Sequence, residues 1–177
     1  FTATAAGFAP ASISLVVTDL PRPDLIATGV TGPAQADTEA MVNVAYRIQN
    51  QGLASAGTNW VTRLFLSRDP LAGDDDFLAE YSFNGTLPVG QFFAQSRQVR
   101  MPLIPGDYWF VVVTDTADQI GEVLEDNNTT VSATPVRITS AYEAVVETEI
   151  NAAPAGTAVP LRGLATRAST GGPAPFV

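Results

Sequence analysis

The side chains that could do chemistry in this 177-residue chain are almost all carboxylates. It has 18 Asp and Glu residues against nine basic residues, which are all Arg, and it contains no His, Cys or Lys. Nucleophilic triads with a His base, Schiff-base chemistry on Lys and His-ligated transition-metal sites are therefore excluded. What remains is catalysis by a carboxylate pair, as in glycosidases, and calcium binding.

Catalysis by carboxylates has three candidates, Glu80, Glu122 and Glu125. Nothing in their spacing distinguishes a catalytic pair from solvated acids in loops. A reaction also needs a built site and not acids alone. We therefore expect that the chain is not an enzyme.

Two acidic loops are the better candidates for a binding site. Calcium takes about six to eight oxygen ligands from flexible loops. The first loop and the strand after it supply the candidate ligands Asp69, Asp74, Asp76 and Glu80, and the second loop carries Asp115, Asp118, Glu122, Glu125 and Asp126. The run SRDPLAGDDD lacks the residue order of an EF-hand loop. We favour the simpler interpretation that these acids cap turns and keep one end of the fold soluble, so that calcium is the one cofactor left open.

Aromatic residues offer a second kind of binding site. Trp60, Tyr108 and Trp109 could form an exposed platform for a sugar. Aromatic residues on alternating strands more often belong to the core, and core is what we expect for all three. Tyr108 is also a candidate for the hydrogen-bonded tyrosine near the corner of immunoglobulin-like sandwiches.

Charge and hydropathy limit the partners and the location. The net charge is −9, whereas phosphate contacts require a basic face, so nucleic acid is not an expected partner. The longest apolar runs, such as residues 108–113, fall far short of the roughly 20 residues that span a bilayer as a helix. We expect no membrane insertion, an extracellular or cell-surface location, and a chain that is a mature product or a fragment.

Short strands at regular spacing must position all of these side chains. The strands are expected at residues 24–31, 41–50, 59–67, 77–83, 91–101, 108–115 and 129–139. Residues 41–50 alternate between apolar and polar side chains, which indicates a half-buried strand. Residues 108–115 are apolar on both faces, which predicts a central strand. The fold class is therefore all-β, an immunoglobulin-like antiparallel β-sandwich without a helix.

Extra strands flank this sandwich at both ends of the sequence. Residues 11–19 read as one strand without an upstream partner, followed by the stiff segment Pro21 to Pro23; a disordered leader is the alternative. Residues 142–150 and 158–166 read as two more strands, too few for an independent domain. We expect residues 1–22 to be the last strand of a preceding immunoglobulin-like domain plus a linker, residues 23–140 to be a complete sandwich, and residues 141–177 to begin a following domain.

Several short motifs, in order, resemble the CARDB family of bacterial cell-adhesion-related domains, which are similar to APHP-type extracellular domains. They are Pro23-Asp24-Leu25, the strand end IQNQG at residues 48–52, WVTRLFLSRD at 60–69, the turn at 87–90, GDY at 106–108 leading into VVVTD, and EVLEDNN at 122–128. The resemblance covers about residues 23–138. It implies a seven-stranded sandwich in a large, exported, repetitive surface protein, and it implies no ligand.

Lone terminal strands need another sheet edge for their backbone hydrogen bonds. We expect residues 11–19 to complete a sandwich begun by residues 142–166 of a neighbouring copy, which repeats head to tail into a filament or sheath. The assembly residues would be Ile13, Leu15, Val17, Tyr142, Val146, Ile150 and Leu161. Partners are thus copies of the chain or adjacent repeats. The alternative is a monomeric tandem-repeat adhesin that binds a protein or carbohydrate.

Overall fold

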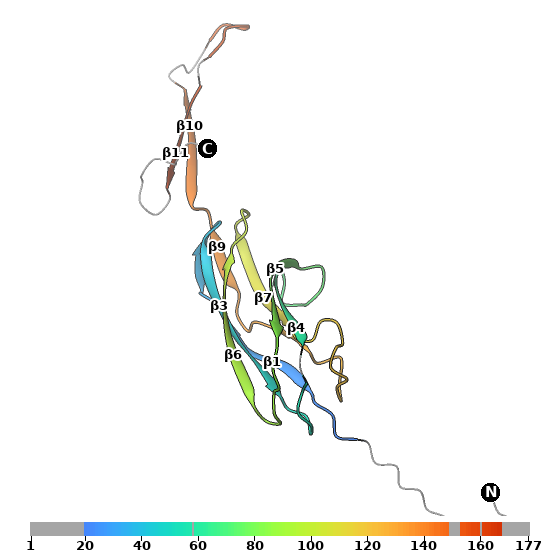
Figure 1. Ribbon diagram of the computed structural model, residues 1–177. Coiled ribbons are helices and arrows are strands. Elements are labelled where there is room, and N and C mark those ends of the chain that lie inside the picture. The colour runs from blue at the N-terminus through green and yellow to red at the C-terminus, as the bar shows by residue number, and fades with distance from the viewer. Residues whose placement is uncertain (1–19, 58, 149–152, 160, 168–177) are drawn as a thin grey trace, which may run out of the picture.

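Two β-sheets form the body of the molecule, and a separate hairpin extends from one end (Figure 1). In this computed structural model, residues 20–57, 59–148, 153–159 and 161–167 are described. The first sheet has the order β1-β3-β6, made of β1 (Leu25–Thr31), β3 (Met41–Asn50) and β6 (Phe92–Arg100). The described part of the chain contains no helix, and hence no helix that could cross a membrane.

The second sheet has the order β2-β9-β7-β4-β5, with β8 paired to β7. Its strands are β2 (Gln35–Asp37), β4 (Trp60–Ser67), β5 (Asp76–Phe83), β7 (Gly106–Val113), β8 (Thr129–Val131) and β9 (Val136–Thr139). The pairings are antiparallel except for that of β2 with β9, which is parallel. The prediction of an all-β, immunoglobulin-like sandwich is confirmed.

The core lies between the two sheets and follows the alternation of the sequence. On β3 the residues alternate between exposed and buried from Met41 to Ile48, because successive side chains of a strand point to opposite faces. The central position of β7, with β4 on one side and β8 and β9 on the other, confirms the strand expected from its apolar faces. The fully buried side chains include Leu25, Val44, Ile48, Trp60, Leu64, Tyr108, Phe110 and Val112.

The expected strands between residues 24 and 115 match β1, β3, β4, β5, β6 and β7, with ends that differ by at most two residues. The single closing strand expected at 129–139 was wrong. It is split into β8 and β9, and Pro135, which has no N–H for a ladder bond, lies in the break. The three-residue β2 was not expected at all.

The hairpin consists of β10 (Tyr142–Thr148) and β11 (Leu161–Arg167), which pair antiparallel from Tyr142↔Arg167 to Thr148↔Leu161. It continues from β9, at the end of the sandwich opposite to the end where the chain enters β1 (Figure 1). At its base the Ala141 N–H donates to Thr38 Oγ1 at 3.1 Å. Within the described residues, the hairpin makes no extensive contact with any strand of the sandwich.

Candidate functional site

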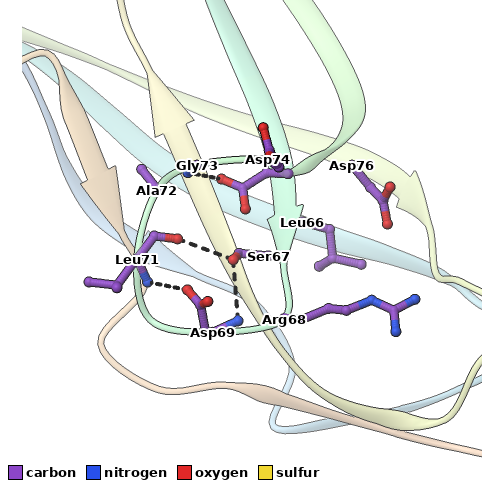
Figure 2. Close-up of a pocket in the computed structure, with 10 residues that line it drawn as sticks. Leu66, Ser67, Arg68, Asp69, Leu71, Ala72, Gly73, Asp74 and Asp76 are labelled. Atoms are coloured by element: carbon purple, nitrogen blue, oxygen red, sulfur yellow. Dashed lines mark hydrogen bonds between the residues drawn. The ribbon is translucent and has the colours of Figure 1, made fainter.

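The first acidic loop surrounds a pocket of about 440 Å³ that extends from Leu66 to Asp76 (Figure 2). Asp69 accepts a hydrogen bond from the Leu71 N–H at 2.9 Å, and the Asp75 carboxylate accepts one from the Gly73 N–H at 3.0 Å. The Asp69 bond reaches the N–H two residues further on, which is the pattern of an Asx turn, whereas the Asp75 bond reaches the N–H two residues earlier. The carboxylates of Asp69 and Asp75 therefore cap turns of their own loop.

The four candidate calcium ligands are spread over this loop and the strand after it. Asp74 and Asp76 are exposed, and Glu80 lies on β5, where its Oε2 is 2.8 Å from Arg63 Nε. In the described ranges, no three acidic side chains come close enough together to hold a metal ion. Calcium binding by Asp69, Asp74, Asp76 and Glu80 stays a prediction.

The second acidic loop holds two carboxylates that are buried rather than solvated. The expectation that the acids of this loop cap turns holds for Asp115, but the expectation that they keep this end of the fold soluble is wrong for both. Asp115 and Glu122 are both only 2% exposed. The Asp115 carboxylate accepts hydrogen bonds from the N–H groups of Gln119 at 3.0 Å and Ile120 at 2.7 Å. It thereby closes the start of the loop, because a buried carboxylate must find donors.

Glu122 joins this loop to the first strand of the sandwich. Its Oε2 accepts a hydrogen bond from the Leu25 N–H at 3.0 Å and, with the amide of Asn128 oriented to donate, one from Asn128 Nδ2 at 3.1 Å. Its Oε1 is buried without a hydrogen-bond partner among the described residues. Burial raises the pKa of Glu122 from 4.5 to about 7, and the nearby charges of Asp115 and Glu125 contribute in the same direction.

The chain enters the sandwich through a fixed joint. The Arg22 carbonyl accepts hydrogen bonds from the N–H groups of Leu53 at 2.8 Å and Ala54 at 3.1 Å, and the Pro23 carbonyl accepts one from the Val123 N–H at 3.0 Å. Residues 22–24 are thus held between the loop after β3 and the second acidic loop. The end of the expected linker is part of the folded sandwich.

Gly52 allows this close approach. A Cβ atom at position 52 would lie 2.5 Å from Asp24 N and from Pro23 C, and 2.6 Å from Arg22 O. All three are backbone atoms, which cannot move aside as a side chain can. The motif IQNQG therefore ends in Gly because another backbone segment crosses it there.

The aromatic candidates belong mostly to the core. Trp60 and Tyr108 are buried, and Trp109 is half-buried. Trp60 stacks on Phe83 with ring centroids 4.2 Å apart. The Tyr108 hydroxyl donates to the Ile104 carbonyl at 2.9 Å, which matches the hydrogen-bonded tyrosine expected near a corner of the sandwich. Trp60 and Tyr108 offer no exposed surface to a sugar.

The candidate assembly residues fall at the two ends of the chain. Ile13, Leu15, Val17 and Ile150 lie outside the described residues. Tyr142, Val146 and Leu161 lie in the hairpin, where their backbones pair with Arg167, Gly163 and Thr148. Neither β10 nor β11 has another strand beside it among the described residues, so each presents an open edge.

Sequence reasoning named Pro23, Asp24, Gly52 and Glu122 as motif or loop residues, but it missed that they meet, together with Arg22, in one joint. Their partners are far apart in the sequence, as in the 97-residue separation of Leu25 and Glu122. Two clues were present: Gly52 at the end of a strand, and an acidic residue within the apolar stretch IGEVL at 120–124. Neither clue identifies its partner without the fold.

The family model that matches this chain is CARDB, over residues 22–132. A crystal structure of the CARDB domain of a Pyrococcus furiosus protein, described as a complex with di-metal ions, has a TM-score of 0.54 and 15% identity, and the match covers 70% of this chain and 99% of that one. A solution structure of the same domain has a TM-score of 0.52 and 15% identity, with coverage of 67% and 97%.

A β-glucosidase from Erythrobacter marinus is also similar in part, with a TM-score of 0.45, 12% identity and coverage of 66% of this chain but 16% of the enzyme. Comparison with curated protein sequences gives no match. The family match covers more than half of the sequence and agrees with the motifs at residues 23–138. The chain therefore belongs to the CARDB family, whose members are non-catalytic, immunoglobulin-like domains related to surface adhesion.

Proposed function

We propose that this chain is an extracellular structural module that joins to copies of itself head to tail. Residues 11–19 of one copy would add a strand to the β10–β11 hairpin of the next copy. The observation that carries the proposal is the hairpin itself, a two-stranded sheet with open edges that stands apart from the sandwich (Figure 1).

A hairpin of this kind is poorly stable alone. A two-stranded sheet in water is marginal, and three or more strands with an apolar face are needed for independent stability. An open strand edge also presents unpaired N–H and C=O groups, which are a template for another strand. A third strand from another copy would satisfy both needs, by the β-strand addition known from other assemblies.

The placement of the two ends supports repetition. The chain enters the sandwich at one end and the hairpin leaves at the other (Figure 1). A contact between different surfaces of the two copies does not close on itself as an isologous dimer does, so it generates a filament or a ring. The expected product is an extended polymer of sandwiches.

Proline substitution tests the pairing of residues 11–19. Leu15→Pro in the full chain removes one backbone N–H and restricts φ in the middle of the added strand. We expect this variant to stay monomeric in sedimentation velocity and to form no fibres in electron microscopy. Ala6→Pro, outside residues 11–19, is the matched control and should assemble like the unmodified chain. Equal assembly of both variants would exclude strand addition by this segment.

The adhesion-related family supports a second candidate function, ligand binding by a monomeric surface repeat. The pocket at residues 66–76 is the site to test, with calcium as the probe. If calcium binds there, it should raise the unfolding temperature of the unmodified chain and leave the unfolding temperature of the Asp74→Asn variant unchanged. Equal shifts, or no shift in either chain, would remove the calcium proposal for this loop.

A further inference from the structure

Four exposed apolar side chains surround the point where the chain enters the sandwich. They are Leu20, Leu53, Val123 and Leu124, which are 81%, 76%, 54% and 48% exposed, and we call them the collar. Single exposed apolar residues are ordinary, but a group of them in one place indicates a contact surface.

Backbone hydrogen bonds keep the collar together. Leu53 and Val123 donate their N–H groups to the carbonyls of Arg22 and Pro23, so the two side chains flank the entering chain. Leu124 follows Val123 directly, and Leu20 lies two residues before Arg22. The collar is therefore a preformed surface, and its binding would not require ordering of the loops that carry it.

We infer that the collar is the surface that binds the tip of the β10–β11 hairpin of a second copy. The inference rests on the proposed strand addition and adds the surface that each copy contacts. The tip consists of residues 153–159, with the sequence APAGTAV, closed by a hydrogen bond from the Thr157 N–H to the Pro154 carbonyl at 3.1 Å. The tip carries no charge, and neither do the four collar side chains, so a contact limited to these residues buries no ion; the exposed Arg22, Glu125 and Asp126 lie beside the collar in the sequence.

Sterics set the direction of the added strand. β10 runs from its base at Tyr142 away from the sandwich, and β11 returns toward it. A donor segment parallel to β11 would end at the base of the hairpin, so its own sandwich would overlap that of the acceptor. A segment that runs from the base to the tip is antiparallel to β11 or parallel to β10, and it places the second sandwich beyond the tip. Antiparallel pairing is the more stable of the two per residue, so we take β11 as the acceptor strand. Because Leu20 follows residue 19 directly, the tip then lies against the collar.

The absence of cysteine in the chain allows a direct test by disulfide cross-linking. One variant of the 177-residue chain carries Leu53→Cys and a second carries Ala155→Cys, and the two are mixed under mild oxidation. A disulfide requires Cα atoms within about 7 Å, so it forms only where collar and tip meet. Leu71→Cys mixed with Ala155→Cys is the matched control, because Leu71 is 69% exposed but lies on the loop between β4 and β5, where Figure 2 shows it pointing outward.

The expected result is a cross-linked dimer with Leu53→Cys at a yield at least ten times that of the Leu71→Cys control. If the unmodified chain assembles but Leu53→Cys gives no higher yield of cross-link than Leu71→Cys, the contact between tip and collar is excluded, whereas strand addition is not. A chain that stays monomeric at millimolar concentration and gives no cross-link would overturn both. The double variant Leu53→Ser, Val123→Ser provides a second readout: it should keep its unfolding temperature and lose at least ten-fold in association affinity, whereas Leu71→Ser should lose none.

Discussion

Glu122 links the second acidic loop to the first strand, at the joint where the chain enters the sandwich. Its carboxyl group is buried, accepts the Leu25 N–H, and has a pKa raised to about 7 by burial. In the unfolded chain the same group has its ordinary pKa of 4.5. The folded state therefore binds more protons than the unfolded state between these two pKa values.

This difference predicts that stability falls as the pH rises from 4.5 to 7. The contribution of Glu122 is fully present below the unfolded pKa and is lost as the pH passes the folded pKa; its size is roughly 2–4 kcal/mol. Urea denaturation across this range measures it. Glu122→Gln should flatten the dependence, and an unchanged slope in that variant would show that another group is responsible.

Gly52 gives a second prediction at the scale of one residue. Gly52→Ala places a Cβ 2.5 Å from backbone atoms of Pro23 and Asp24, so the joint must shift. We expect a loss of about 1–3 kcal/mol in the free energy of unfolding. Gly57→Ala is the control, because its Cβ would meet Ile120 Cδ1 at an ordinary 4.0 Å. Chemical denaturation of both variants checks this, and equal stabilities would contradict the close approach.

For single residues, the sequence pattern predicts burial where the periodicity of a strand determines it. The pattern fails where burial depends on partners that are far away in the sequence. The alternation in residues 41–50 was enough to place Val44 and Ile48 inside. The burial of Glu122 depends on the Leu25 N–H, a donor 97 residues away that only the fold brings near. Asp115 is buried as well, although its donors, the N–H groups of Gln119 and Ile120, are close to it in the sequence. The acids of the first loop, by contrast, behave as the sequence predicts, since Asp69 and Asp75 bond to neighbours two residues away.

Among the elements, the hairpin differs from the strands of the sandwich in what supports it. β3 and β7 are paired on both sides and contribute to the core, whereas β10 and β11 pair with each other. The strand pattern predicted their existence, because a strand needs only local alternation. It could not predict β2, which has three residues and depends on parallel pairing with β9.

This difference predicts unequal hydrogen exchange. In dilute monomer the amides of β10 and β11 should exchange much faster than those of β3 and β7, because few packed neighbours oppose their opening. In assembled protein β11 should become protected, since it receives the added strand. Exchange measured by mass spectrometry before and after assembly tests this. Protection of β11 that does not change with assembly would argue against its role as the acceptor.

At the scale of the whole molecule, charge opposes association. Each copy has a net charge of −9, while the proposed contacts are mainly backbone hydrogen bonds and uncharged side chains; the charged residues among them are Asp19 of the donor segment and Arg162 and Arg167 of β11. Added salt should therefore strengthen assembly, because it screens the repulsion between copies; the Debye length falls from about 30 Å at 0.01 M to about 8 Å at 0.15 M. Light scattering against salt concentration measures the effect. Weaker assembly at higher salt would mean that ion pairs hold the copies together.

Copies of this chain are proposed to join head to tail, and sedimentation velocity of the unmodified 177-residue chain tests this joining without any variant or label. Over a series from micromolar to millimolar concentration, we predict a rising weight-average sedimentation coefficient with species larger than a dimer, since each added copy presents a new open hairpin. A single, concentration-independent species with the mass of one chain would contradict the claim.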